Sequence, residues 1–285
     1  MNAKILDIPS SEYHQLSELS RSQLATFRES PYGYMKQHIE RDPEWQIEVT
    51  PAMEDGTLLH SLVLDHPDLI DGEPQDFPGL AIIPQSVLSK SGSRAGGAWT
   101  EFAEMNAGQI LRKSHEVREI WAWAKMLCRG KAGDNLFCGE AKNEQTVIWQ
   151  HECNGNVIDL RARLDRVILG EAIVDLKTCG NADMNDLSRT IASAGYDFQA
   201  AMYRWAWYSA TGELLPFRFV FIQKDKPYLT RVYEMSEDWL SNALGAVFAT
   251  LEALNAARLS GNYQDKKADV IYLAQQPKYH ILEGV

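Results

Sequence analysis

The sequence predicts an α/β protein in which helices flank a central mixed sheet, with helical additions at the N-terminal end. Apolar residues recur at helical spacing through much of the first 140 residues. From Glu144 the period changes, and β-branched residues fall into three strand-like runs that end at Thr178. Helical and strand patterns then alternate towards the C-terminus. We therefore expect one sheet covered by helices.

The chain of 285 residues is expected to form a single domain, 1–285. Its parts are a mainly helical segment at 1–140, the sheet and a following helix at 141–235, and a helix and tail at 236–285. No apolar run is long enough to span a bilayer, and the first residues lack the apolar core of a signal peptide. We expect a soluble cytoplasmic protein with no membrane partner.

Two features of composition limit the function. The net charge of −11 argues against a polyanionic partner, unless a divalent metal ion and local basic residues compensate for it. The cysteines contain no CxxC pair, which argues against a zinc site and a disulfide framework; they are Cys128, Cys138, Cys153 and Cys179.

The N-terminal part predicts helices broken by turns. A short helix from Gly56 to Leu64 is stopped by Pro67, and a longer helix is expected from Trp99 to Leu127. The core of this longer helix is expected to contain Ile110, Leu111, Val117, Ile120, Trp121 and Trp123. Between the two helices, the stretch "SKSGSRAGGAWTEF" is flexible by composition and carries Lys90 and Arg94.

The later part predicts a sheet and two long helices. Three antiparallel strands between Glu144 and Thr178 are joined by turns at "NGN" and at Gly170. A helix from Leu187 to Tyr208 and two strands, "FRFVFIQ" and "YLTRVYEM", follow. The last helix is capped by Ser236 and ended by Gly261.

A hairpin centred on Gly170 brings together charged side chains from two strands. Equal steps outward place Asp165 opposite Asp175 and Arg163 opposite Lys177, with the apolar residues of both strands on the other face. Opposed Cβ atoms lie about 4.5–5.5 Å apart, so two carboxylates can hold one cation. Oxygen ligands favour Mg²⁺ or Mn²⁺, and Lys177 could position or deprotonate a metal-bound water. The alternative is a pair of cross-strand salt bridges on a solvated face.

Five segments of the chain resemble the PD-(D/E)XK nuclease superfamily. Leu164-Asp165 stands in place of the "PD" with leucine for proline, and Asp175-Leu176-Lys177 in place of the "(D/E)XK". Further matches are "GTLLH", which ends in His60, the acidic strand start at Glu144, and "FQAAMY", which contains Gln199 and Tyr203. The pattern resembles the RecB-like branch, and within it the exonuclease-domain family of exodeoxyribonuclease VIII (RecE), often carried by prophages.

The resemblance implies a role for each matched residue. His60, Asp165, Asp175 and the main-chain carbonyl of Leu176 would bind the metal, and Lys177 would be the catalytic lysine. Glu144 would support the site or a second ion, and Gln199 and Tyr203, on one helix face, would reach substrate phosphate or the lysine. The basic residues expected to contact DNA phosphates are Arg161, Arg163, Arg21, Arg28, Lys90 and Arg94.

The resemblance also implies an activity. It is a Mg²⁺-dependent, ATP-independent exonuclease that digests double-stranded DNA from 5′ to 3′, with Mn²⁺ able to replace Mg²⁺. The implied partners are DNA ends, a single-strand annealing protein of the RecT or Red-beta type, and further copies of the chain in a ring-shaped trimer or tetramer. No iron–sulfur cluster is expected, because no cysteine follows Cys179. The alternatives are an endonuclease, an exonuclease of opposite polarity, and a non-catalytic module that binds DNA ends.

Overall fold

A mixed sheet forms the centre of the computed structural model, which describes residues 2–129, 136, 137 and 139–265. Its order is β1-β5-β6-β7-β8-β9, and β2 pairs with β6. The pairs β7–β8 and β2–β6 are parallel and the others antiparallel, which confirms the mixed sheet. The strands are β1 Ala3–Leu6, β2 Leu19–Ser20, β5 Lys142–Cys153, β6 Asn156–Ile168, β7 Ala172–Cys179, β8 Phe217–Gln223 and β9 Thr230–Glu234.

Both predicted hairpins are present. Asn154 and Gly155 have φ values of 50° and 79°, the left-handed conformations that a tight turn between β5 and β6 requires. Gly170, with φ of 71°, lies in the turn between β6 and β7. Arg166 pairs with Val174 and Ile168 with Ala172, so the register is centred on Gly170 as predicted.

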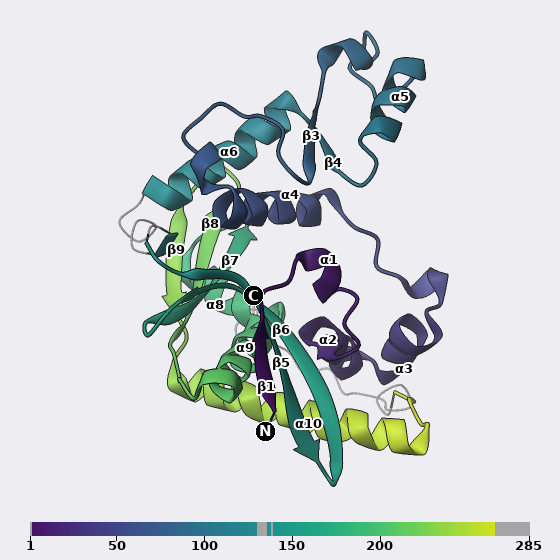
Figure 1. Cartoon of the computed structure of the whole chain (residues 1–285), viewed down its shortest axis with the longest axis vertical. Helices are drawn as coiled ribbons and strands as arrows, with labels where there is room; N and C mark the ends of the chain where they lie inside the picture. Colours follow the sequence, from purple (N-terminus) through teal and green to yellow (C-terminus); the bar gives the residue numbers. More distant parts are fainter. Residues whose placement is uncertain (1, 130–135, 138, 266–285) are drawn as a thin grey trace, which may run out of the picture.

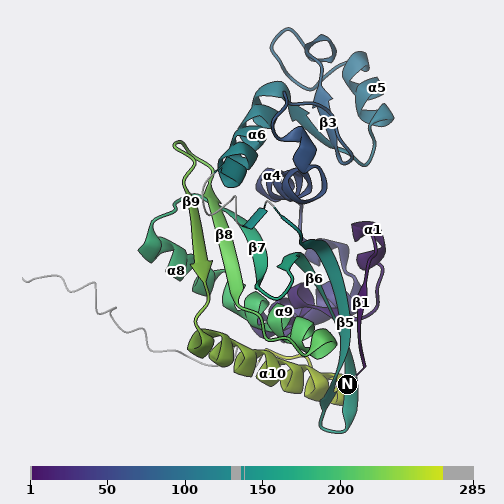
Figure 2. The same ribbon diagram turned by 60° about the vertical axis from the view of Figure 1, so that its left-hand side comes forward.

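Helices cover both faces of the sheet, with α9 and α10 on one side and α4 and α6 on the other (Figures 1 and 2). Phe217, Phe219 and Phe221 of β8 point into the α9-side core, whereas Val220 and Ile222 point into the α4-side core. The helices are α1 Ser10–Tyr13, α2 Arg21–Glu29, α3 Pro31–Tyr34, α4 Pro51–His60, α5 Gly97–Met105, α6 Ser114–Arg129, α8 Met184–Ser193, α9 Tyr196–Thr211 and α10 Glu237–Ser260.

Short helical turns complete the N-terminal part. The π-helix Met35–Glu40 extends α3, and the π-helix Ser61–Asp65 continues α4 directly after His60. The 3₁₀ turns are Pro43–Trp45, Pro67–Leu69 and Gln85–Val87. The expected helix from Gly56 to Leu64 is therefore α4 and its π-helical continuation.

The expected helix from Trp99 to Leu127 is wrong as a single element. It consists of α5, strand β4 Ile110–Lys113 and α6. Gly108, with φ of 86°, follows the end of α5, and β4 then pairs in parallel with β3 Leu80–Ile83. These strands and α5 project from the α4 side as a separate small layer (Figure 1).

The expected helix from Leu187 to Tyr208 is likewise two helices. Gly195 separates α8 from α9 and has φ of 63°, a left-handed conformation that a helix interior does not allow. The last helix matches its prediction, because the Ser236 side chain accepts a hydrogen bond from the Trp239 amide and Gly261 follows Ser260 with φ of 67°.

The predicted N-terminal segment and the cysteines can also be compared with the structure. The segment expected to be mainly helical supplies β1 and β2 to the central sheet. Cys153 and Cys179 are buried free thiols, and Cys138 lies outside the described residues. Within the described ranges, none of the helices has both the length and the hydropathy of a membrane span.

Candidate active site

The site is built where β6 and β7 separate. The two strands pair only between Arg166–Ile168 and Ala172–Val174, whereas β7 continues beside β8 as far as Cys179. Beyond the last paired residues, side chains take the place of the β6 backbone as contacts of the Leu176 main chain. We call this point of separation the fork. The Leu176 amide donates to Asp165 Oδ2 at 2.9 Å, and its carbonyl lies 2.8 Å from His60 Nε2. The fork therefore brings three sequence-predicted groups together.

Asp175 and Lys177 lie beside this fork, on the α9 side. Asp175 is 1 % exposed, and its Oδ2 accepts a hydrogen bond of 2.6 Å from Gln199 Nε2 of α9. Its Oδ1 forms an ion pair with Lys177 Nζ. The Lys177 ammonium also lies 5.2 Å from the ring centroid of Tyr196. Gln199 therefore contacts the aspartate, not the lysine.

The expected placement of the apolar faces is wrong. Leu160, Ala162 and Leu164 of β6 pack in the α9-side core, but Val174 and Leu176 of β7 pack in the α4-side core. The side chains of β6 stop alternating between the two faces after Leu164. Val167, three residues later, lies in the same core, whereas regular alternation would place it on the opposite face. The break lies beside Glu144, whose φ of 51° interrupts the regular pairing with β6. Helices cover both faces, so the site is not on a solvated face.

The divergence of the strands also alters the expected cross-strand pairs. Asp165 and Asp175 follow the predicted register one step beyond the last paired residues, Arg166 and Val174. Arg163 does not pair with Lys177; it donates from Nε to Glu144 Oε2 at 2.5 Å and from Nη1 to the Ile8 carbonyl at 2.9 Å. The arginine therefore belongs to the Glu144 side of the site.

Three ligand groups gather at the open end of the fork. His60, Glu144 and Asp165 each offer one ligand atom, and these atoms lie within 4.8 Å of one another. His60 Nδ1 is 3.5 Å from Asp165 Oδ2. Carboxylate oxygens with one imidazole fit a hard divalent cation such as Mg²⁺ or Mn²⁺. The chemistry of this donor set fits the predicted metal, but the cluster contains Glu144 and not the predicted ligand Asp175, whose oxygens contact Gln199 and Lys177.

Comparison with known proteins identifies the family. The model of a family described as "PDDEXK-like domain of unknown function (DUF3799)" matches residues 20–266. The chain belongs to this family. The matched residues include Asp165 and Asp175-Leu176-Lys177, the segments whose sequence resembles the two halves of the PD-(D/E)XK motif.

One solved structure shares the fold of this chain at low sequence identity. The crystal structure of a "Putative exonuclease" from Eubacterium rectale aligns with a TM-score of 0.63 and 16 % identity, over 98 % of this chain and 100 % of that one. A second structure, SSO0001, aligns with a TM-score of 0.28 and 14 % identity over 68 % and 85 % of the two chains, too weakly to support an argument. None of the curated proteins compared with the chain matches it.

Burial perturbs the acidic groups of this PDDEXK-like site. Burial, and then the charge of Asp165, raise the pKa of Asp175 to about 6, although Lys177 opposes the shift. Burial and Asp165 also raise the pKa of Glu144, against the opposing effect of Arg163. Carboxyl groups crowded in this way favour a bound cation, which offsets their mutual repulsion.

The same charges keep Lys177 protonated. Burial lowers the pKa of its ammonium, but the charges of Asp175 and Asp165 together outweigh burial and raise that pKa. A protonated ammonium donates hydrogen bonds and stabilises negative charge. In the site without a metal ion, Lys177 is therefore suited to position groups and to stabilise negative charge.

Tyr203 lies one helical turn after Gln199 on α9 and is half-buried. Burial, and then the charges of Tyr13 and Asp175, raise the pKa of its hydroxyl well above the usual value. The hydroxyl therefore stays protonated and can donate to an anion. Tyr196 was not predicted from the sequence to be a site residue, although its position three residues before Gln199 places it on the same side of the helix.

The basic residues predicted to contact DNA differ in their exposure and in their hydrogen-bond partners. Arg161 is buried and donates to the carbonyls of Tyr13 and Leu16, which contradicts its expected place on a DNA-facing surface. Arg21 donates to the carbonyls of Ala194 and Gly195 at the break before α9. Arg28, Lys90 and Arg94 are exposed. Arg28 lies over the Phe198 ring, and Arg94 lies over the Trp99 ring.

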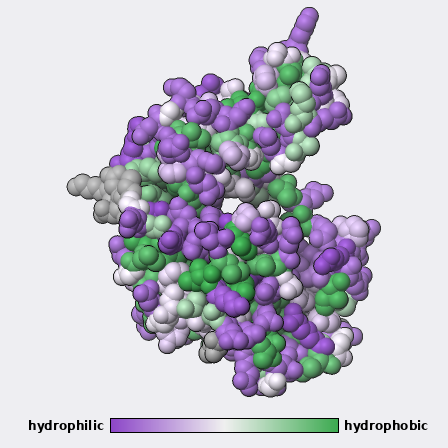
Figure 3. Space-filling view, in the orientation of Figure 1, coloured by the Kyte–Doolittle hydropathy of each residue, from purple (hydrophilic) through white to green (hydrophobic). Residues whose placement is uncertain are grey.

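A cavity of about 550 Å³ opens beside His60. Its walls are residues of α4 and the following π-helix, the start of α1, and the Glu144–Arg163 pair; they include Thr57, Ser61, Asp65 and Ser10. The surface is hollowed between the projecting β3–β4–α5 layer and the lower body (Figure 3).

Replacing Gln199 by alanine is expected to weaken Mg²⁺ binding about 10-fold. The change removes the amide that holds Asp175 Oδ2, so the carboxyl is less well oriented and its ionised form less stable. Titration calorimetry with Mg²⁺ measures the affinity. Asn255→Ala is the matched control, because it removes a buried amide donor from α10 that bonds the distant Cys153 carbonyl. Equal Mg²⁺ affinity in both variants would contradict the assignment of Gln199.

Proposed function

We propose that this PDDEXK-like chain is a Mg²⁺-dependent nuclease that digests double-stranded DNA from its ends, 5′ to 3′ and without ATP. The observation that carries the proposal is the contact of His60 and Asp165 with the main chain of Leu176, directly beside the Asp175–Lys177 ion pair. The family membership supports a nuclease. The finer activity, an exonuclease that leaves a 3′ single strand, follows from the resemblance to the RecE-type family.

The reaction is phosphodiester hydrolysis. The oxygen of water bonds to phosphorus, the bond from phosphorus to the 3′ oxygen breaks, and that oxygen takes a proton, which leaves a 5′-phosphate and a 3′-hydroxyl. His60, Asp165, Asp175 and the Leu176 carbonyl, with Glu144 beside them, would hold a Mg²⁺ ion, which would supply Lewis-acid activation of water and phosphate. Mn²⁺ can replace it because its ligand preferences are similar.

The side chains of the chain have separate tasks in this reaction. Lys177 carries a proton at Nζ and stabilises the charge that develops on the phosphate oxygens. Gln199 orients the Asp175 carboxylate, and the Tyr203 hydroxyl donates to phosphate. His60 can keep its Nε2 contact with the Leu176 carbonyl and offer Nδ1, which lies 3.5 Å from Asp165 Oδ2, as a metal ligand.

The biological setting belongs to the same proposal. The 3′ single strand would be passed to an annealing protein of the RecT or Red-beta type for DNA recombination in the cytoplasm, and the chain would act as a ring-shaped trimer or tetramer. The sequence contains no GxxxxGK[ST] motif, in agreement with digestion that needs no ATP. Arg28, Lys90 and Arg94 are the exposed cations proposed to contact DNA phosphates.

Purified chain with Mg²⁺ and linear duplex, labelled separately at the 5′ and 3′ ends, is expected to release the 5′ label first. EDTA should stop the release, and covalently closed circular duplex should stay intact. Early loss of the 3′ label would establish the opposite polarity, and cleavage of the circle would establish an endonuclease. Binding of DNA ends without nucleotide release at any Mg²⁺ or Mn²⁺ concentration would overturn the catalytic proposal in favour of a binding module.

A further inference from the structure

The helix that carries His60 is held differently at its two ends. Leu58 and Leu59, in its last turn, are buried in the α4-side core. Pro51, Ala52 and Met53, in its first turn, are exposed, and Gly56 lies in the middle, where glycine weakens a helix. Apolar packing therefore fixes the end of α4 and leaves its beginning to other contacts.

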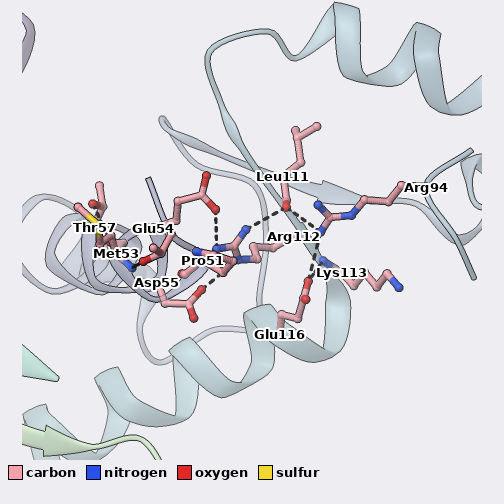
Figure 4. Close-up of polar contacts among 11 residues, drawn as sticks. Pro51, Met53, Glu54, Asp55, Thr57, Arg94, Leu111, Arg112, Lys113 and Glu116 are labelled. Carbon is pink, nitrogen blue, oxygen red and sulfur yellow. Dashed lines mark hydrogen bonds and ion pairs between the residues drawn. The ribbon is translucent and has the colours of Figure 1, made fainter. Parts of the chain in front are cut away.

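Arg112 of β4 supplies those contacts (Figure 4). Its guanidinium donates from Nη2 to Glu54 Oε2 at 2.8 Å and to the Pro51 carbonyl at 3.1 Å, and from Nε to Asp55 Oδ1 at 3.0 Å. The arginine is 5 % exposed, so these ionic hydrogen bonds are shielded from water. One side chain thus holds three successive parts of the first half of α4.

The strand behind Arg112 is itself well anchored. β4 pairs with β3 through four residues, and the Lys113 amide donates to Glu116 Oε2 of α6 at 2.6 Å. Arg94 donates to the Leu111 carbonyl at 3.2 Å and lies 3.8 Å from Glu116 (Figure 4). Arg112 therefore projects from a fixed support, and α4 is positioned against the β3–β4–α5 layer as well as against the sheet.

We propose that Arg112 is a positioning residue of the metal centre: by holding the first half of α4, it adds to the packing of Leu58 and Leu59 in fixing where His60 presents its imidazole to Asp165 and Leu176. The β3–β4–α5 layer is then part of the catalytic apparatus. This inference rests on the proposed metal-dependent function. A shift of about 1 Å in a supporting element is enough to disable a site of this kind, because ligand geometry is set by the contacts behind it.

The test measures Mg²⁺ binding by titration calorimetry and, without metal, hydrogen exchange of the α4 amides. Arg112→Met is expected to weaken Mg²⁺ binding about 10-fold and to speed exchange at Leu58, Leu59 and His60. Arg112→Lys should recover part of the affinity, because an ammonium keeps the charge but not the planar fork. The matched control is Arg218→Met, which removes an arginine of β8 that also pairs with two carboxylates, Glu171 and Glu234, each at 2.9 Å.

A double-mutant cycle separates positioning from general stability. In the His60→Ala background, Arg112→Met should cause no further loss of Mg²⁺ affinity, because the residue it positions is gone. An additive loss, an equal loss in Arg218→Met, or unchanged exchange in α4 would overturn the inference. If Arg112→Met does not fold, the double variant Glu54→Gln with Asp55→Asn removes the two negative charges that pair with Arg112, on side chains that are 32 % and 26 % exposed.

The outcomes also separate this inference from the proposed function. Wild-type protein that binds no Mg²⁺ contradicts both. Normal Mg²⁺ binding without DNA digestion contradicts the nuclease and leaves the positioning role standing. Normal digestion with unchanged Mg²⁺ affinity in Arg112→Met contradicts the positioning role alone.

Discussion

Lys177→Ala is expected to lower the rate of Mg²⁺-dependent digestion of linear duplex by about 10²- to 10³-fold, the usual effect of removing one donor that stabilises developing charge. Lys177 is a half-buried cation that pairs with Asp175, and its raised pKa keeps it charged at neutral pH. Asp175→Ala is expected to abolish digestion, because it removes a proposed metal ligand. The rate of nucleotide release under single-turnover conditions measures both effects.

The fold should survive these changes. Without Lys177, the Asp175 carboxyl loses a charge that lowers its pKa, so it takes up a proton and keeps its hydrogen bond to Gln199. Thermal unfolding checks this expectation. Lys142→Ala removes an exposed lysine of β5 and should leave the rate unchanged. Digestion at the wild-type rate by folded Lys177→Ala protein would refute the assignment of the catalytic lysine.

The sequence predicts the hairpins well because their signals are local. Asn154 and Gly155 permit a turn that few other residues allow, and Gly170 centres a register in which Arg166 meets Val174. Asp165, Asp175 and Lys177 could therefore be placed near one another from strand alternation alone. Gly195 offered an equally local signal for the break between α8 and α9, and it was overlooked in favour of the apolar spacing around it.

Other features depend on contacts that no local pattern encodes. β1 and β2 have four and two residues, and their sheet partners lie more than 100 residues away. The divergence of β6 from β7 lets side chains replace a backbone ladder at Leu176, and His60 reaches that carbonyl from 116 residues earlier. Only the resemblance linked His60 to the site. Arg112 had no signal, because its role arises from the layer that places β4 beside α4.

Mg²⁺ is expected to raise the melting temperature of the protein, and to raise it more at pH 8 than at pH 5. At about one hundred times its dissociation constant, the ion adds about 2.7 kcal/mol, or about 5–10 °C for a chain of this size. The Asp175 pKa is about 6 in the folded metal-free protein, above its usual 3.8. The folded state therefore binds this proton more tightly than the unfolded state, and the resulting stability, complete below pH 3.8, is lost as the pH rises through about 6. Above that pH, the buried carboxylate is ionised and the cation offsets its charge.

Asp175→Asn separates this effect from other titrations, because the amide keeps the shape of the side chain without an ionisable proton. In the absence of metal, the melting temperature of the wild type should fall relative to that of Asp175→Asn as the pH rises through about 6. With Mg²⁺, the variant should show a smaller stabilisation at pH 8, because one proposed ligand charge is missing. Scanning calorimetry of both proteins at pH 5 and pH 8, with Mg²⁺ and with EDTA, measures each of these melting temperatures. A Mg²⁺ stabilisation that is equal at both pH values, or unchanged in Asp175→Asn, would show that the cation does not bind at this carboxylate.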